Sequence, residues 1–341
     1  MPATTRSATI QEVAARAGVS RAAVSKVIRN AYGVSPRMRE RVQSAVDELG
    51  YRPRVSARSM RGSSYTIGID LPDLNNTFFT QLVNGATSAL ADTGYQLIIA
   101  PAAPGYDLGQ RSVEALADRQ VDGIIVVSAR VSAQWLENLS TQVPLVMLGR
   151  HDDSANYDTV VCDDYLGAQL VVRHLYQLGH RRIVHLTENE VVYRLSGFPH
   201  AYRLEGYKNT MRELGLSDKI EVARVSETSQ EAAARATRDI LVNATTPVGI
   251  FAAHDVLALG ALEAITNLGM DASQASVVGF DDVQIAAHSR ISLTSVNQSG
   301  MYMGETCIRL LMERISGRTE AVHEVVAPHL MTRGSTSPPR M

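Results

Sequence analysis

Cysteine is scarce in this 341-residue chain, which has only Cys162 and Cys307. The two lie far apart in the sequence, each among apolar residues, and neither has a Cys or His partner at metal-ligand spacing. We therefore expect two reduced, buried side chains rather than a structural disulfide, and we predict no metal site.

Long apolar runs are also missing. No stretch of eighteen apolar residues occurs, and the opening residues MPATTRSATI contain no apolar core of a secretory signal. The sequence therefore predicts neither a membrane partner nor export, and we expect a cytoplasmic protein.

Common catalytic motifs are absent as well. The sequence has no G-x-x-x-x-G-K-[ST] phosphate loop and no G-x-S-x-G nucleophile motif. The three histidines between 174 and 185 are better explained by packing or capping than by catalysis. The paired acids Asp163-Asp164 and Asp281-Asp282 could suggest acid/base chemistry, but neighbouring residues rarely converge on one bond, so ligand hydrogen bonding is the preferred interpretation. We predict no enzymatic activity and no cofactor.

The first fifty residues, in contrast, predict three short helices around one small core. Apolar residues recur at the i, i+3, i+4 spacing of a buried helical stripe. They are Ile10, Val13 and Ala14, then Val24, Val27 and Ile28, then Met38, Val42, Ala45, Val46 and Leu49. Start signals stand at Thr9 with Glu12, at Ser20, and at Ser35 with Pro36, and the stop signals are Gly18 and Gly50.

The first two of these helices, joined by a turn containing glycine, make a helix-turn-helix. The second helix is expected to leave a polar face pointing away from the core, which a DNA major groove would admit. That face consists of Arg21, Ala22, Ser25, Lys26 and Arg29. The alternative is a solvated basic face, but charge favours DNA: residues 1–62 hold twelve Lys and Arg against four Asp and Glu, a net +8, in a chain whose total is −2.

Residues 51–62, YRPRVSARSMRG, are compatible with a helix but too short to be stable alone, so DNA could order them. A plain soluble linker is the alternative. From Tyr65 onward, short apolar runs alternate with helix-like segments, as in parallel sheets covered on both faces. The runs are 66–71, 95–100, 123–127 and 144–148, followed by 182–186, 248–253 and 275–280. Two α/β lobes are therefore predicted.

Residues 9–62 resemble the DNA-binding head and hinge of the lactose-repressor (LacI/GalR) family of bacterial transcriptional regulators. Further similar motifs continue along the body: LGHRRI (178–183), RLEGY (203–207), HDVLALGAL (254–262), VVGFDD (277–282) and RGST (333–336). The resemblance implies a small all-α helix-turn-helix head and an α/β body with parallel sheets in a two-lobed, periplasmic-binding-protein-like fold. It also implies a homodimeric repressor of a sugar-uptake or catabolism operon. Such a repressor would bind a pseudo-palindromic double-stranded operator under the control of a small polar effector, expected to be a sugar.

The same resemblance sets the expected domain limits. Residues 1–50 would form the head, 51–64 the hinge and 65–341 the effector-binding and dimerisation domain. The first lobe would comprise about 65–161 plus 293–320, and the second about 162–292 plus 321–341. Crossovers are expected near 161–164, 289–295 and 319–323, with helix Gly300–Ile315 in the first lobe and strand His323–Leu330 in the second.

The resemblance also assigns roles at the DNA. Arg21, Ala22 and Lys26 would choose operator bases, although Lys26 replaces a common Arg and lacks its bidentate fork. The remaining residues are Ser20, Ser25, Arg29 and Asn30 for phosphates, and Arg54, Arg58 and Met60 for the hinge in the minor groove. Met60 replaces the usual Leu, so the kink that it makes would be less sharply defined.

Effector residues are expected just after strand ends, where open parallel sheets bind ligands. The candidates are Asp73, Asn75, Phe78, Phe79, Arg150, Asp163, His254 and Asp281, together with Arg203. In the resemblance, Arg203 and Asp281 contact the effector, and an imidazole at His254 replaces the family's usual amide. The alternative for Arg203 and Asp281 is a lobe-closing salt bridge or a helix cap.

Two other classes of protein compete with a repressor. A sugar-processing enzyme tethered to DNA would need a nucleophile or a cofactor loop, which the sequence lacks. A plain sugar receptor would not need the basic head and hinge. Both are therefore less favoured than a ligand-controlled regulator.

Overall fold

The computed structural model describes residues 8–28, 32–51, 63–102, 109–127, 130–188, 197–242 and 244–340. The chain forms two compact units, Met1–Ser64 and Tyr65–Met341. In the first unit, the three predicted helices are α1 (Ile10–Ala17), α2 (Arg21–Ile28) and α3 (Pro36–Leu49). Their core centres on Val13, Val24 and Val42, which are fully buried.

Local capping explains where these helices begin and end. The Thr9 hydroxyl accepts from the Glu12 amide and the Glu12 carboxylate accepts from the Thr9 amide, which confirms the capping box. The Ser20 and Ser35 hydroxyls likewise accept from amides in the first turns of α2 and α3. Gly18 has φ +61°, a left-handed conformation that ends α1 at little cost for glycine.

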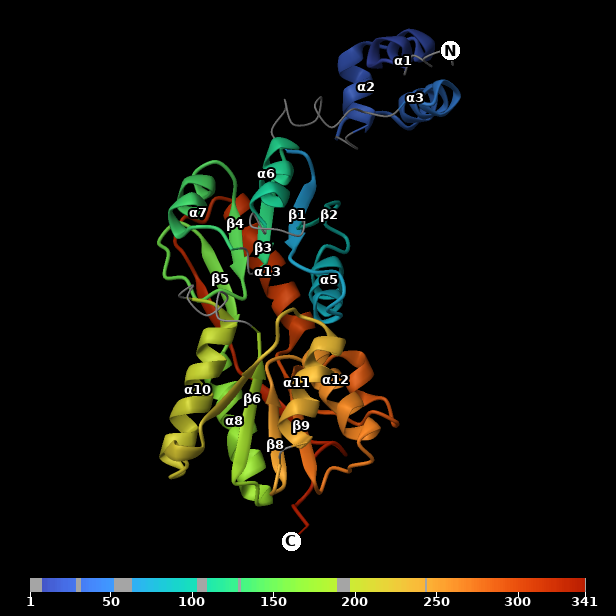
Figure 1. Cartoon of the computed structure of the whole chain (residues 1–341). Helices are drawn as coiled ribbons and strands as arrows, with labels where there is room; N and C mark the ends of the chain where they lie inside the picture. Colours follow the sequence, from blue (N-terminus) through green and yellow to red (C-terminus); the bar gives the residue numbers. More distant parts are fainter. Residues whose placement is uncertain are drawn as a thin grey trace. The chain divides into compact units, whose positions relative to one another are not determined.

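The first lobe of the second unit is built on a six-stranded parallel sheet (Figure 1). In spatial order, its strands are β11 (His323–Val326), β5 (Asp158–Cys162), β4 (Leu145–Leu148), β3 (Gly123–Val127), β1 (Thr66–Leu71) and β2 (Gln96–Pro101). Its helices are α5 (Phe78–Ala89), α6 (Gln110–Asp118), α7 (Ala133–Ser140) and α13 (Gly300–Ile315).

The second lobe has a six-stranded sheet that is parallel apart from its edge strand β12. Its strands are β12 (His329–Met331), β10 (Thr294–Asn297), β9 (Ala275–Asp281), β8 (Val248–Ala252), β6 (Arg182–Thr187) and β7 (Glu221–Arg224). Its helices are α8 (Asp164–Leu178), α10 (Pro199–Glu213), α11 (Gln230–Val242) and α12 (Asp255–Asn267), with short 3-10 turns at Ser217–Lys219 and Gln284–Ala287.

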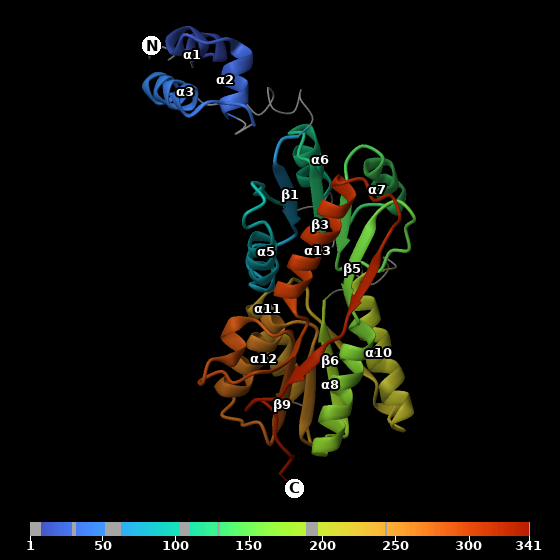
Figure 2. The same ribbon diagram turned by 180° about the vertical axis from the view of Figure 1, so that it is seen from behind.

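The chain passes between the lobes three times, and two of the predicted crossings were wrong (Figures 1 and 2). The first passage follows Cys162, as expected. The second lies between Asn297 and Gly300, because β10 pairs with β9 in the second sheet. The third lies between Val326 and His329: β11 pairs with β5 in the first sheet, so the predicted strand 323–330 is divided between the lobes. The predicted lobe limits 293–320 and 321–341 shift accordingly.

Helix α13 returns to the first lobe as predicted, and glycines let it approach α5 closely. A Cβ atom at Gly304 would lie 2.1 Å from the Leu82 carbonyl oxygen, and one at Gly85 would lie 1.9 Å from that of Met301. Both contacts are too short for any side chain. The two helices can therefore pack backbone to backbone only because both positions are glycine.

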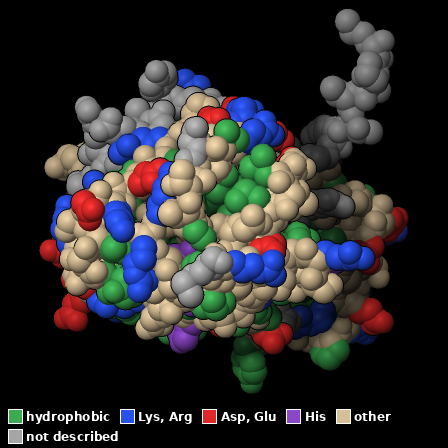
Figure 3. Space-filling model, turned by 60° about the horizontal axis from the view of Figure 1, so that its bottom comes forward, with side chains coloured by type: hydrophobic (Ala, Val, Ile, Leu, Met, Phe, Trp, Pro, Cys, Tyr) green, Lys and Arg blue, Asp and Glu red, His purple; other side chains and the backbone are tan. Residues whose placement is uncertain are grey.

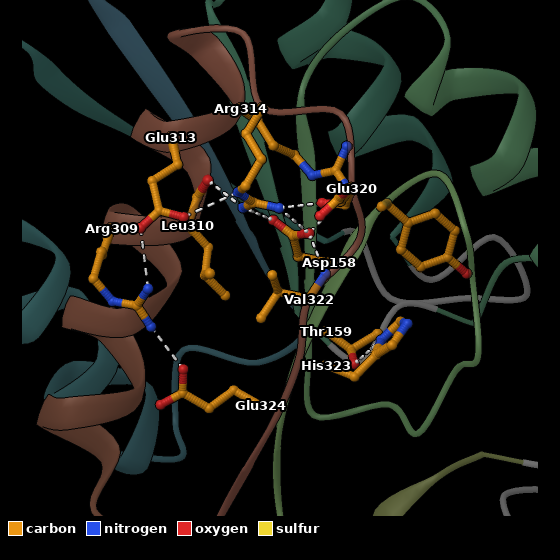
Figure 4. Close-up of polar contacts among 12 residues, drawn as sticks. Asp158, Thr159, Arg309, Leu310, Glu313, Arg314, Glu320, Val322, His323 and Glu324 are labelled. Atoms are coloured by element: carbon orange, nitrogen blue, oxygen red, sulfur yellow. Dashed lines mark hydrogen bonds and ion pairs between the residues drawn. The ribbon is translucent and has the colours of Figure 1, made fainter.

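A buried carboxylate joins the end of α13 to the start of β5 and β11 (Figure 4). Asp158 is fully buried and accepts from Arg314 Nη2 at 2.9 Å, from Arg318 Nη2 at 2.7 Å and from the Val322 amide at 2.9 Å. This cluster holds the segment that leads from the helix into the third passage.

Two further expectations concern the whole chain. Cys162 and Cys307 are free and buried, as predicted. Among the residues described, no helix has both the length and the apolar character needed to cross a membrane.

Candidate functional site

A cleft of about 910 Å³ lies between the two lobes of the second unit. Its volume falls in the range of small-molecule sites. The first lobe contributes the ends of β1 and β2 and the start of α5. The second contributes the segments after β6, β7 and β8. The lining residues are Asp70, Leu71, Pro72, Asp73, Leu74, Asn76, Phe79, Pro101, Ala102, Gly109, Arg130, Glu188, Phe198, Pro199, His200, Ser226, Glu227, Thr228 and His254.

Three of the nine predicted effector residues, Asp73, Phe79 and His254, line this cleft. Asn75 is exposed and its amide donates to Asp73, while its neighbour Asn76 takes the place in the lining. Phe78 is buried in the core of the first lobe, because it is the first residue of α5 and faces inward.

Arg150 and Asp163 also lie outside the lining, and both side chains have structural partners. Arg150 Nε lies 2.8 Å from both Asp152 carboxylate oxygens, and its Nη1 donates to the Val131 carbonyl. Asp163 is the N-cap of α8 and accepts from the Leu166 amide at 2.9 Å. The Asp163 carboxylate therefore caps α8 in this structure.

Arg203 is buried beside the cleft in an ion pair. Its Nε lies 2.8 Å from Asp164 Oδ1, its Nη1 donates to the Ala253 carbonyl, and its guanidinium stacks 3.7 Å from the centre of the Phe280 ring. Burial alone would raise the pKa of the Asp164 carboxyl, but the charge of Arg203 and the hydrogen bond from His151 outweigh it and lower that pKa. Asp164 therefore stays ionised between its two partners.

His151 brings the first lobe into this network. It follows β4, its Nε2 lies 3.0 Å from Asp164 Oδ2, and its ring stacks on Tyr202 of α10 with centroids 4.0 Å apart. Its amide also donates to the Gly197 carbonyl at 2.8 Å. The Arg203 network thus reaches across the lobes.

Asp281 makes a second contact between the lobes. Its Oδ2 accepts from the Asn76 side-chain amide of the first lobe at 3.0 Å, and its Oδ1 accepts from Gln298 at 2.6 Å. Burial raises the pKa of this carboxyl, against the opposing charges of Arg203 and His254. Asp281 thus has the geometry of the lobe-closing alternative, and its contact with an effector stays a prediction.

In the second lobe, His254 Nε2 lies 3.3 Å from Glu188 Oε1, which also accepts from the Thr228 hydroxyl at 2.7 Å. Burial would raise the pKa of Glu188, but the neighbouring imidazoles of His200 and His254 and these hydrogen bonds lower it instead. Because the carboxylate accepts, the tautomer of His254 with a single ring proton carries it on Nε2, and Nδ1 is left as an acceptor.

Sequence reasoning missed several lining residues. Glu188 directly follows β6 and satisfies the strand-end rule that found the others. Asp70 was visible as the one acid inside the apolar run TIGIDL. Phe198 and His200 stand at the start of α10, far along the chain from a strand end, and no local signal marked them.

Asp70 leads to a pH prediction. Burial raises the pKa of its carboxyl to about 8, and the hydrogen bond from the Val127 amide only partly opposes the rise. Between the ordinary value of 3.8 and about 8, the folded protein keeps a proton that the unfolded chain has lost. Stability contributed by this group therefore falls as pH rises through that window.

Asp70→Asn should remove this loss, since an amide oxygen can still accept from Val127. We expect the melting temperature of the variant minus that of the wild type to increase steadily between about pH 5 and about pH 8.5. Thermal denaturation followed by circular dichroism measures the difference. Parallel curves for the two proteins would contradict the prediction.

In the first unit, α2 presents the predicted outward residues Arg21, Ala22 and Lys26 to solvent. Ser25 does not point away from the core: it is 7% exposed, because it adjoins Val24 at the edge of the buried stripe and its side chain is short. The Ser20 hydroxyl is occupied as the cap of α2. The predicted residues Arg29, Asn30, Arg54, Arg58 and Met60 lie outside the described residues.

The turn between α1 and α2 is held by α3. Arg41 Nη2 donates to the Ala17 carbonyl at 2.5 Å and lies 3.4 Å from that of Gly18. The angle at which α2 presents its exposed face therefore depends on all three helices.

Comparison with known proteins agrees with both units. Residues 9–54 match the model for bacterial regulatory proteins of the lacI family, and residues 172–336 match the periplasmic binding protein-like domain. The transcriptional regulator MalR of Streptomyces coelicolor is 35% identical to this chain, over 96% of each protein. The chain belongs to the LacI family of bacterial transcriptional regulators.

Other members of the family support the same assignment for this LacI-family chain. The regulator CelR of Thermobifida fusca is 32% identical over 97% of this chain and 98% of its own length. A crystal structure of the lac repressor dimer bound to operator and an anti-inducer has a TM-score of 0.82 and 26% identity, and it covers 97% of this chain and 100% of that one. This LacI-family chain is a DNA-binding transcriptional regulator, and the relatives named here are regulators rather than enzymes.

Proposed function

We propose that this LacI-family regulator is a cytoplasmic, homodimeric repressor of a sugar-uptake or catabolism operon. A sugar bound in the cleft between the lobes would control its affinity for a pseudo-palindromic operator. The cleft carries the proposal, because a ligand that contacts both lobes can bind two arrangements of the lobes with different affinities. Only a ligand with such a difference in affinity can shift the populations of the two arrangements.

The chemistry of the cleft supports a sugar. Two aromatic rings, Phe79 from the first lobe and Phe198 from the second, stand among carboxylates and imidazoles that can bind hydroxyl groups. Similar proteins add weight: one is named the ribose operon repressor of Escherichia coli, and a solved structure is titled as a CelR–cellobiose complex. A smaller cavity of about 590 Å³ at residues 179–182 and 218–221 lies wholly in the second lobe, so a ligand there would not touch both lobes.

A mobility-shift assay tests the proposal. An operator is first selected from random DNA with the full-length protein, and ribose, cellobiose and glucosamine are then added in turn. We expect two protomers on each palindrome and a change in operator affinity with at least one sugar, without turnover of that sugar. An unchanged shift with every sugar of a broad metabolite panel, or catalytic turnover of the sugar, would contradict the proposal.

The exposed face of α2 gives the first prediction for DNA. Arg21→Ala and Lys26→Ala should each weaken binding to the selected operator by about 1–3 kcal/mol, because each removes a base contact. Binding to unrelated DNA should change far less.

Arg16→Ala is the matched control, since Arg16 is an exposed arginine of the same unit that pairs with Glu48 instead of lying on α2. Its removal should affect operator and unrelated DNA by the same small factor. Wild-type operator affinity in both α2 variants would show that this helix does not read the bases.

A further inference from the structure

Two buried polar atoms at the cleft stand out because they have no hydrogen-bond partner among the described residues. They are Asp70 Oδ2 in the first lobe and His254 Nδ1 in the second. Both residues belong to the lining of the cleft, and their exposed fractions are 0% and 4%. Buried polar groups in native proteins are almost always paired, so an unpaired atom at a binding cleft indicates a place for a ligand group.

Asp70 is an unusual residue for its position. It lies on β1, between β3 and the edge strand β2 of the first sheet, where the remaining residues are Thr66, three aliphatic side chains and Gly68. Its Oδ1 is used by the fold, since it accepts from the Val127 amide on β3 at 2.7 Å. Its Oδ2 is not used, and burying a carboxyl without a partner is costly. The structural role of Asp70 therefore explains only one of its two oxygens.

The two unpaired atoms would both be satisfied by hydrogen-bond donors of a ligand. His254 donates its Nε2–H to Glu188, so in the tautomer with a single ring proton Nδ1 accepts. Without a ligand the Asp70 carboxyl keeps its proton up to about pH 8. A donor that approached Oδ2 would favour release of that proton, so that Oδ2 accepts from a hydroxyl or from an ammonium. A ligand that satisfied both atoms would carry hydrogen-bond donors at two separated positions, one facing each lobe.

The charge of the residues that line the cleft restricts the class of ligand that it can bind. Among its described residues there are four carboxyl groups, Asp70, Asp73, Glu188 and Glu227, against the single arginine Arg130. Residues 63–341 carry a net −10, since 21 Lys and Arg stand against 31 Asp and Glu. Acidic and basic side chains are interspersed on the face drawn in Figure 3, whereas carboxyl groups outnumber arginine in the lining of the cleft. This excess opposes an anionic ligand.

We propose that Asp70 is an effector-binding residue at the floor of the cleft, and that the effector is a neutral or amino sugar rather than a phosphorylated or otherwise anionic one. This inference rests on the proposed function of the cleft and adds the residue and the ligand class. The hydroxyl or amino group of the sugar would donate to Asp70 Oδ2, and a second donor would reach His254 Nδ1.

Cysteine labelling tests the position without knowledge of the effector. Asp70→Cys is treated in the folded, full-length protein with the cationic reagent 2-aminoethyl methanethiosulfonate and with its anionic 2-sulfonatoethyl counterpart. In each reaction the thiolate attacks the sulfenyl sulfur, a mixed disulfide forms and methanesulfinate leaves. Cys162 and Cys307 of the wild type are buried and provide the background rate, and Asp73→Cys, on the partly exposed wall, is the positive control.

We expect Asp70→Cys to react at least about tenfold faster than the two native thiols, because its side chain faces the cleft. We also compare the ratio of the two labelling rates, cationic over anionic, with the same ratio for a free thiol in solution. We expect this ratio to be about tenfold higher at Asp70→Cys, because of the acidic lining. A rate no higher than that of the native thiols would show that Asp70 is only a structural carboxyl. Equal corrected rates for the two reagents would overturn the proposed ligand class.

Thermal-shift assays of the wild type and of Asp70→Asn, which keeps the acceptor for Val127, show which class of sugar binds and whether Asp70 contributes to its binding. The probes are ribose and cellobiose with hydroxyl groups only, glucosamine with an ammonium, and ribose 5-phosphate as the anion. We expect a neutral or amino sugar to raise the melting temperature of the wild type, and the variant to bind that sugar at least about tenfold more weakly. Stabilisation by ribose 5-phosphate, or an unchanged sugar affinity in Asp70→Asn, would overturn the inference. The proposed function fails on different results, namely that no sugar alters operator binding or that the protein turns the sugar over.

Discussion

Arg203→Ala should lower the free energy of unfolding by about 3–5 kcal/mol, because it leaves the Asp164 carboxylate buried without its guanidinium. Asp164 is 1% exposed, and His151 would be its remaining side-chain partner. The variant would also lose the stacking on Phe280 and the hydrogen bond to Ala253. Urea denaturation of the full-length protein gives the difference.

A matched control separates burial from charge. Arg182→Ala removes an arginine of the same lobe whose partner Glu221 is 40% exposed, so we expect a loss of at most about 1 kcal/mol. Replacing both Arg203 and Asp164 with apolar residues should recover much of the loss, since buried ion pairs are often matched by packed hydrophobic residues. Similar losses for Arg203→Ala and Arg182→Ala would show that the buried pair has no special weight.

A second substitution at Arg203 shows whether its side chain contacts the effector or instead supports the contacts between the lobes. Arg203→Lys keeps the charge but removes the planar fork. If this variant folds with near wild-type stability but no longer responds to the sugar, Arg203 contacts the effector. An unchanged response in a stable Arg203→Lys protein would mean that Arg203 is a positioning residue for Asp164 and for the contacts between the lobes. Calorimetric titration with the responding sugar measures the difference.

Asp158→Ala should lower the free energy of unfolding by a similar amount, again about 3–5 kcal/mol, because Arg314 would be left buried without its acceptor. Arg314 has a 9% exposed side chain, and Asp158 also holds Arg318 and the Val322 amide (Figure 4). Glu313→Ala is the control within the same cluster, since Glu313 is 40% exposed and its removal should cost at most about 1 kcal/mol. A difference of less than about 1 kcal/mol between Asp158→Ala and Glu313→Ala would contradict this role.

The contribution of Asp158 should also depend on pH. Burial would raise the pKa of its carboxyl, but the hydrogen bonds from Arg318 and Arg314 lower it below the ordinary 3.8. Its stabilisation is therefore complete above that value and is lost as pH falls through the lower, folded value. Acid denaturation of the wild type should accordingly be steeper below about pH 4 than that of Asp158→Ala.

The head could be predicted from the sequence almost to the residue because its determinants are local. Capping residues lie three positions from the amides that they bind, as Thr9 does from Glu12. The seven predicted strands of the body were found for a similar reason, since each is a short apolar run. Three strands were not identified as such: β5, β7 and β10 have only four or five residues and include charged or polar side chains, such as Asp158 and Glu221.

The crossings between the lobes could not be placed in this way. Whether residues 323–326 join the first or the second sheet depends on pairing with β5, more than 150 positions earlier in the chain. Two short strands in succession, β11 and β12, look like one strand in the sequence. Only the partner strands show that the chain leaves one sheet and enters the other between Val326 and His329.

By itself, the sequence determined the three-helix head, the parallel α/β character of the body and the family, because helix caps, apolar periodicity and motifs are local patterns. Only the tertiary structure decided which polar side chains are available to a ligand. Arg203 pairs with Asp164 across 39 positions and Asp281 with Asn76 across 205, so both carry partners that no spacing rule could anticipate. Among the described residues, Asp70 keeps one oxygen without a hydrogen-bond partner, because the amide that β3 supplies donates to the other oxygen.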